Sequence, residues 1–196
     1  MEHRGLSQTP QNSDKLDKRY SIWFDVFTDS VDIHRRARSE NHYGPVLFVL
    51  DLRLIEQVYT GRVWVTKRNP TKWRGKARRE RWFQSVEDLN NNFSYGSFDH
   101  MIVFRHCGGE LPFRAFLKEI ILDDPGMKTD KGADLFSVAY GALRLAMTDS
   151  KFDIPIRKRK CASGCRCKRN YRRTARTTYE RFVPDILGHQ EGRKTT

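Results

Sequence analysis

The feature that most constrains this chain is its strongly basic C-terminal quarter. Residues 157–181 contain eleven Lys and Arg side chains against one acid, Glu180, and so carry ten of the thirteen net positive charges of the 196-residue chain. Such a density of like charge opposes compaction unless a polyanion, a metal or disorder relieves it. Nucleic acid is the most economical partner, because each neutralised phosphate releases counterions. The stretch therefore predicts a nucleic-acid partner.

The composition of this basic stretch also favours nucleic acid. Arginine outnumbers lysine, and its planar guanidinium makes bidentate contacts with phosphate. Tyr171, Tyr179 and Phe182 lie among or just beside the charges, where aromatic rings can stack on bases. A solvated tail is the alternative. We expect the phosphate contacts to come from ten residues, Arg157, Lys158, Arg159, Lys160, Arg166, Lys168, Arg169, Arg172, Arg173 and Arg176.

Three of the four cysteines, Cys161, Cys165 and Cys167, lie within the same stretch. Thiolates this close together can share one zinc ion when a fourth ligand comes from elsewhere in the chain. Neighbouring cations lower thiol pKa values and favour thiolate, although they also repel a metal ion. A zinc site at these cysteines and a set of unpaired surface thiols both remain open.

The rest of the chain has the composition of a folded core. The chain has twelve Phe, seven Tyr and four Trp residues, most of them between residues 20 and 150, and these predict a packed interior there. No run approaches the roughly 20 apolar residues that a membrane span needs, so we expect no membrane partner. The polar N-terminus lacks the apolar stretch of a signal peptide, which predicts a cytoplasmic protein. We expect a flexible arm over residues 1–19, an α+β core domain over 20–150 and a basic, Cys-containing extension over 151–196.

The hydrophobic pattern predicts the α+β class. Strands are expected at 21–27, 46–50, 62–67, 101–104 and 119–122, with 46–50 buried on both faces. Helices are expected at 51–58, after the capping residue Ser85, and over 133–147, where the apolar spacing is clearest. Together these elements predict a mixed, mostly antiparallel sheet with a few short helices, one longer amphipathic helix and a basic C-terminal extension.

Several common catalytic motifs are missing from the sequence. There is no phosphate-binding loop of the G-x-x-x-x-G-K-[ST] type, no H-E-x-x-H zinc motif and no G-x-S-x-G elbow. No cluster of acids with a lysine has the spacing of a metal-dependent nuclease. A second basic segment, Lys67–Arg81, contains Trp73 and is followed by Trp82.

The order of several segments carries a family resemblance. A strand ends in Phe27-Thr28-Asp29, Tyr43-Gly44-Pro45 leads into an apolar strand closed by Asp51, and Phe98-Asp99-His100 precedes the next strand. With the segment 116–122, this order resembles bacterial and phage-encoded ADP-ribosyltransferase-like proteins, including the DarT-type DNA-modifying toxins. The resemblance covers about residues 20–122.

The resemblance implies NAD as cofactor and a small set of site residues. Asp99 stands near the place of the family's catalytic glutamate, where a carboxylate would stabilise the oxocarbenium-like transition state. Thr28 would orient the ribose, and Arg19 or Tyr20 would lie near the mouth of the cofactor pocket. The expected function is therefore that of an ADP-ribosyltransferase-like protein acting on or near nucleic acid. The alternatives are a non-enzymatic nucleic-acid-binding module, stabilised by zinc in one version, and a nuclease.

Overall fold

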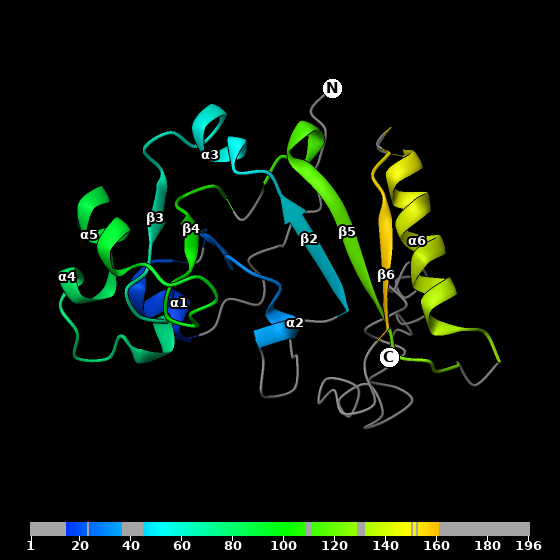
Figure 1. The fold of residues 1–196 in the computed structure, drawn as a ribbon, viewed down its shortest axis with the longest axis horizontal. Coiled ribbons are helices and arrows are strands. Elements are labelled where there is room, and N and C mark those ends of the chain that lie inside the picture. The colour runs from blue at the N-terminus through cyan, green and yellow to red at the C-terminus, as the bar shows by residue number, and fades with distance from the viewer. Residues whose placement is uncertain are drawn as a thin grey trace, which may run out of the picture. The chain divides into compact units, whose positions relative to one another are not determined.

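The described part of the chain forms two compact units. In the computed structural model, residues 15–22, 24–36, 45–108, 111–128, 132–149, 151 and 153–160 are described. Unit 1 takes the sequence ranges 1–36 and 50–117, and unit 2 takes 37–49 and 118–196. Each unit has its own three-stranded sheet (Figure 1). The predicted α+β class is confirmed, with pairing that is mostly antiparallel and one longer helix.

Unit 1 combines short strands with several short helices. Its elements are α1 (Lys15–Tyr20), β1 (Val26–Thr28), α2 (Ile33–Arg36), α3 (Arg53–Gln57), β3 (Val63–Val65), a 3-10 helix (Pro70–Lys72), α4 (Arg78–Arg81), α5 (Val86–Asn92), β4 (Ile102–Phe104) and a second 3-10 helix (Arg114–Phe116). Strand β4 is central, with β1 and β3 antiparallel on either side of it. This sheet is called sheet A.

Sheet A is covered on both faces. Successive side chains of a strand point to opposite faces, so Val103 and Phe104 of β4 face opposite sides. Val103 belongs to an aromatic cluster with Ile22, Trp73 and Trp82. On the other face Phe104 packs with three further buried residues, Leu54, Tyr59 and Leu111. The three short strands are therefore held between two small cores.

Unit 2 contains the longest strands and the longest helix of the described residues. They are β2 (Val46–Leu50), β5 (Leu117–Asp124), α6 (Leu135–Asp149) and β6 (Ile156–Lys160), and the strand order is β2-β5-β6 in a second sheet, called sheet B. Hydrogen bonds from Asp51 N to Phe116 O and from Asp123 N to Pro45 O, at the two ends of β2, fit an antiparallel pair. Strand β6 pairs with β5 in parallel.

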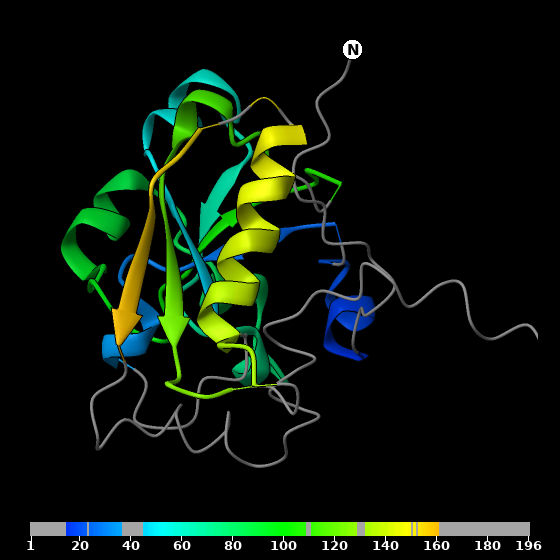
Figure 2. The same ribbon diagram turned by 90° about the vertical axis from the view of Figure 1, so that its right-hand side faces the viewer.

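Helix α6 connects the two parallel strands and covers one face of sheet B (Figure 2). A parallel pair needs such a crossover, and the helix supplies it. Leu135 and Ala139 of α6 are buried against Leu122 of β5. Ile156 of β6 packs against the same cluster. The apolar spacing that predicted a helix over 133–147 is thus the face that α6 turns to the sheet.

Three sequence predictions differ from the structure in ways that have a local cause. The strand predicted at 21–27 is confined to β1, because Ser21 has φ 54° and Asp25 N bonds to Ile22 O in a turn that sends Ile22 into the aromatic cluster. Strand β2 was expected to be buried on both faces, yet its residues are half-buried because it is an edge strand. Strand β6 was not predicted, because four of its five residues are cations.

The expected boundaries at residues 19/20 and 150/151 stay predictions. Among the described helices, none combines the length and apolarity needed to cross a bilayer.

Candidate nucleic-acid interface

The basic segment Lys67–Arg81 forms a loop that leaves and rejoins sheet A. Thr66, directly after β3, forms a bridge with Trp82, and Lys67 N bonds to Arg81 O at 2.8 Å. The loop contains eight Lys and Arg residues and one acid, Glu80. We call it the basic loop. Its two ends are thus hydrogen-bonded to each other, and the loop starts and finishes at the same place beside sheet A.

Tryptophan side chains pack the basic loop against the core of unit 1. Trp73 is 1% exposed, its indole nitrogen donates to Arg68 O at 2.6 Å, and its ring lies 4.9 Å from that of Trp82. Trp82 in turn meets Trp64 edge-on at 5.3 Å. Paired aromatic rings of this kind add to the stability that their burial provides. Trp73 therefore holds the backbone of the loop in place, and neither its ring nor that of Trp82 is available to a ligand.

Some arginines are used in the same packing. The guanidinium of Arg81 lies 4.7 Å from the ring centre of Tyr20, and that of Arg105 lies 4.9 and 5.0 Å from the rings of Trp64 and Trp82. Arg105 also pairs with the fully buried carboxylate of Asp25 at 2.5 Å. Cation–π and ion-pair contacts of this kind fix the guanidinium groups inside the unit. These arginines hold the core together.

Other cations of the basic loop are at least partly exposed to solvent. Lys67, Lys72 and Lys76 pair with Asp88, Asp99 and Glu80 at 2.6, 2.9 and 3.3 Å. By contrast, Arg74 and Arg79 are exposed and make no side-chain hydrogen bond, ion pair or ring contact with another described residue. A guanidinium group in that state can bind a phosphate without first breaking a contact with the protein.

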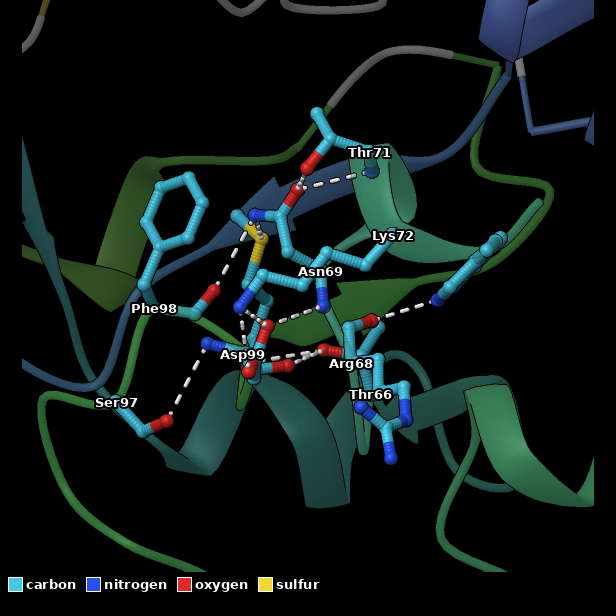
Figure 3. A network of polar contacts seen from close by, with 10 residues as sticks. Thr66, Arg68, Asn69, Thr71, Lys72, Ser97, Phe98 and Asp99 are labelled. Carbon is cyan, nitrogen blue, oxygen red and sulfur yellow. Dashed lines mark hydrogen bonds and ion pairs between the residues drawn. The ribbon is translucent and has the colours of Figure 1, made fainter. Parts of the chain in front are cut away.

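Asp99 connects the basic loop to the turn before β4 (Figure 3). Its carboxylate accepts a hydrogen bond from Asn69 N at 2.9 Å, and Lys72 Nζ lies 2.9 Å from each of its oxygens. Its backbone carbonyl accepts from Thr66 Oγ1 at 2.5 Å. Asn69 Nδ2 donates to Phe98 O at 3.2 Å. The two segments are thus joined by side-chain and backbone contacts at several points.

The contacts of Asp99 keep its carboxyl group ionised. Partial burial raises the pKa of Asp99, but the hydrogen bonds from Asn69 N–H and the Lys72 ammonium outweigh that effect, so the pKa lies below its ordinary value. The group is therefore a carboxylate near neutral pH, and its negative charge is shared with the backbone and Lys72.

The four residues suggested by the family resemblance all lie in unit 1. Thr28 is opposite Ile102 in the β1–β4 pair, three residues after Asp99, so both residues stand at the same end of sheet A. Thr28 Oγ1 donates to Ile102 O at 2.9 Å. Arg19 is exposed at the end of α1, while the Tyr20 ring packs edge-on against Trp73 at 5.3 Å. The roles that the resemblance implies for these residues stay predictions.

The first four cations expected to bind nucleic acid form strand β6. Arg157 pairs with Glu119 at 3.0 Å, Lys158 with Asp124 at 2.9 Å, and Arg159 with the fully buried Asp123 at 2.5 Å. Lys158 also lies 4.3 Å from the ring centre of Phe136, whereas Lys160 is exposed. Carboxylates of β5 therefore balance much of the charge of β6. The acids at 119, 123 and 124 are the sequence signal that could have predicted the pairing of β5 with β6.

The remaining expected cations, Arg166, Lys168, Arg169, Arg172, Arg173 and Arg176, lie outside the described residues, as do Cys161, Cys165 and Cys167. Within the described ranges, no group of His, Cys, Asp or Glu side chains is placed to hold a metal ion. Cys107 Sγ is engaged with the carbonyl oxygens of Phe24 and Phe104, each at 3.4 Å.

Comparison with known proteins gives no family assignment: no family model, curated protein or solved structure matches the chain. The resemblance to ADP-ribosyltransferase-like proteins therefore stays a prediction.

Proposed function

We propose that this protein binds nucleic acid and that the basic loop of unit 1 supplies phosphate contacts. The observation that carries the proposal is that some side chains of the loop are buried while others are exposed and unengaged in the described structure. Trp73 is buried and fixes the backbone, while Arg74 and Arg79 are exposed and have no side-chain partner among the described residues. A rigid backbone that presents unpaired arginines lowers the entropic cost of binding a polyanion. The exposed guanidinium groups then contact phosphates.

The described strand β6 contributes less to this binding than its charge suggests. Arg157, Lys158 and Arg159 each have a carboxylate partner on β5, so a phosphate would have to compete with an existing ion pair. The cations from residue 166 onward remain expected contacts. The proposal thus places one phosphate-binding surface on the basic loop and leaves a second as an expectation for the C-terminal stretch.

The experiment compares two charge-matched variants of the full chain. Arg74→Gln/Arg79→Gln removes the two exposed arginines, and Arg62→Gln/Lys128→Gln removes the same charge from exposed positions outside the loop. Fluorescence anisotropy with a labelled oligonucleotide of about 12 nucleotides is measured from about 50 to 200 mM salt. We expect the loop variant to reduce the slope of log affinity against log salt by about 1 to 2 units.

The control variant should keep nearly the wild-type slope, because its lost charges act only at long range and are screened. Equal slopes for the loop variant and the control variant would refute phosphate binding by the basic loop. Wild-type protein that binds no oligonucleotide even at the lowest salt would refute the function itself.

NAD-dependent transfer to nucleic acid is kept as a second candidate, because the β1–β4 pair brings Thr28 and Asp99 to one end of sheet A. The contacts of Asp99 support a structural role for its carboxylate as well. Asp99→Asn separates the two roles, since a transferase site needs the carboxylate for activity and the network needs it for stability.

A further inference from the structure

The turn that follows α5 presents aromatic side chains to solvent. Tyr95 is 79% exposed, the largest exposed fraction among the described large hydrophobic residues, and Phe98 in the same turn is 44% exposed. The nearby tryptophans, by contrast, are buried in the core of unit 1. Exposing a tyrosine ring to this extent gives up the stabilisation that its burial would provide.

The turn is held in place by contacts at several positions. Gly96 has φ 73°, its amide donates to Ser30 Oγ at 3.0 Å, and a Cβ at that position would meet Val31 Cγ2 at 3.3 Å. Ser94 N donates to His100 Nδ1 at 2.9 Å. Glycine is therefore the favoured residue next to Tyr95, and hydrogen bonds hold the backbone on both sides of the ring.

Other rings support Tyr95 from one side. The ring of Phe93 meets it edge-on at 5.1 Å and stacks on the His100 ring at 5.7 Å. His100 in turn contacts Phe83 edge-on at 5.2 Å. A ring that is supported along one edge and open to solvent elsewhere loses little rotamer entropy when a flat ligand stacks on it.

This turn adjoins the basic loop. Asn69 of the loop donates to Phe98 O, and Lys72 pairs with Asp99 (Figure 3). In the close view the Phe98 ring extends away from the Asp99 carboxylate. Aromatic faces and phosphate-binding cations are thus carried by two segments that are hydrogen-bonded to each other. This is the combination by which proteins hold single-stranded nucleic acid.

We propose that Tyr95 stacks on an unpaired base of a strand whose phosphates lie on the basic loop, with Phe98 as a neighbouring apolar contact. The inference rests on the proposed function and deepens it, because it selects single-stranded over double-stranded nucleic acid. In a duplex the base faces are occupied by neighbouring bases, so a duplex can use only the cations. Stacking tolerates every base, so no sequence preference is expected.

The test uses variants that distinguish the effect of the flat ring face from the effect of apolar side-chain volume. Tyr95→Leu keeps an apolar side chain without a ring face, Tyr95→Phe keeps the face, and Val86→Ala changes a residue of α5 that is similarly exposed at 73%. Each is titrated by anisotropy with oligothymidylate, oligouridylate, an abasic strand and a duplex, all of about 12 units. Trp fluorescence and circular dichroism verify that the variants fold.

We expect Tyr95→Leu to weaken binding of a base-containing single strand about tenfold or more, and Tyr95→Phe and Val86→Ala to change it less than about twofold. The arm in which the loss occurs, oligothymidylate, oligouridylate or both, identifies which of these two strands stacks on Tyr95. Duplex and abasic-strand binding should be the same for wild type and Tyr95→Leu. The wild type should bind the abasic strand about as weakly as Tyr95→Leu binds the complete one.

Two results would overturn the stacking site. One is wild-type affinity of Tyr95→Leu for both base-containing single strands, and the other is an equal loss for duplex or abasic strand. If the wild type binds and Arg74→Gln/Arg79→Gln weakens that binding while Tyr95→Leu does not, the stacking site fails and the proposed function stands. If the wild type binds none of the four probes, the proposed function fails and the stacking site fails with it.

Discussion

Replacing Asp99 by asparagine tests whether its carboxylate holds unit 1 together. The carboxylate is 27% exposed, accepts the Asn69 N–H and pairs with Lys72, whose side chain is 51% exposed. A hydrogen bond to a charged group contributes about 1.5–3 kcal/mol. The half-exposed Lys72 pair adds about 0–1 kcal/mol. Because asparagine retains one accepting oxygen, we expect Asp99→Asn to lower the free energy of unfolding by about 1–2 kcal/mol.

The measurement is urea denaturation followed by tryptophan fluorescence. All four tryptophans fall in the sequence ranges of unit 1, so their emission reports the unfolding of that unit. A loss of this size shifts the midpoint by about 0.5–1 M urea. Lys72→Ala is the matched control, and we expect a shift that is less than half as large, because it removes only the exposed half of the contact.

The effect should depend on pH with a definite sign. The pKa of Asp99 is lowered in the folded state, so its contribution is present above the unfolded-state pKa of about 3.9 and is lost as the pH falls through the folded-state value. Wild type and Asp99→Asn should therefore differ near neutral pH and converge in acid. Equal urea midpoints at neutral pH would refute the structural role. If Asp99 acted only in catalysis, the variant would lose transfer activity without losing stability.

Two further predictions concern unit 2 and the C-terminal stretch. Asp123→Asn removes the buried partner of Arg159 and should lower the free energy of unfolding by about 3 kcal/mol, because the guanidinium is left without its counter-charge in a mostly buried position. Thermal unfolding followed by far-UV circular dichroism measures the loss. A melting curve equal to that of the exposed control Asp153→Asn would contradict the prediction. If Cys161, Cys165 and Cys167 hold zinc, elemental analysis of the purified chain should find about one equivalent of zinc, and Cys165→Ser should reduce that content. Wild-type protein that contains no zinc after purification in zinc-supplemented buffer would identify the three cysteines as ordinary thiols.

Local signals predicted the elements whose stability is local. Ser85 caps α5 as expected, since its hydroxyl accepts from Asp88 N at 3.1 Å, and the apolar spacing of residues 133–147 matches α6. The apolar run at 46–50 is strand β2. Capping and amphipathic spacing involve residues within one or two turns of each other, so a single sequence carries them.

Pairing across long sequence separations could not be predicted in the same way. Strand β6 has the composition of a solvated tail until Asp123 is placed beside Arg159, which is 36 residues away. Trp73 stands among cations in the sequence, yet it is buried because Ile22 and Val103 converge on it from other parts of the chain. Tyr95 has the opposite outcome, because it is 79% exposed although tyrosine is a residue of intermediate burial on average. Tertiary contacts decided all three cases.

The charge pattern of β6 also affects how two copies of the chain meet. In the described part of the chain β6 is an edge strand of sheet B, and an open edge offers unpaired backbone groups to another strand. Its residues 157–160 are all cations, so antiparallel pairing of two β6 edges would set like charges opposite one another. The carboxylates that accept this strand lie on β5, inside the same chain. The strand is therefore attracted to its own sheet and repelled by its copy, which protects the β6 edge of sheet B against edge-to-edge pairing.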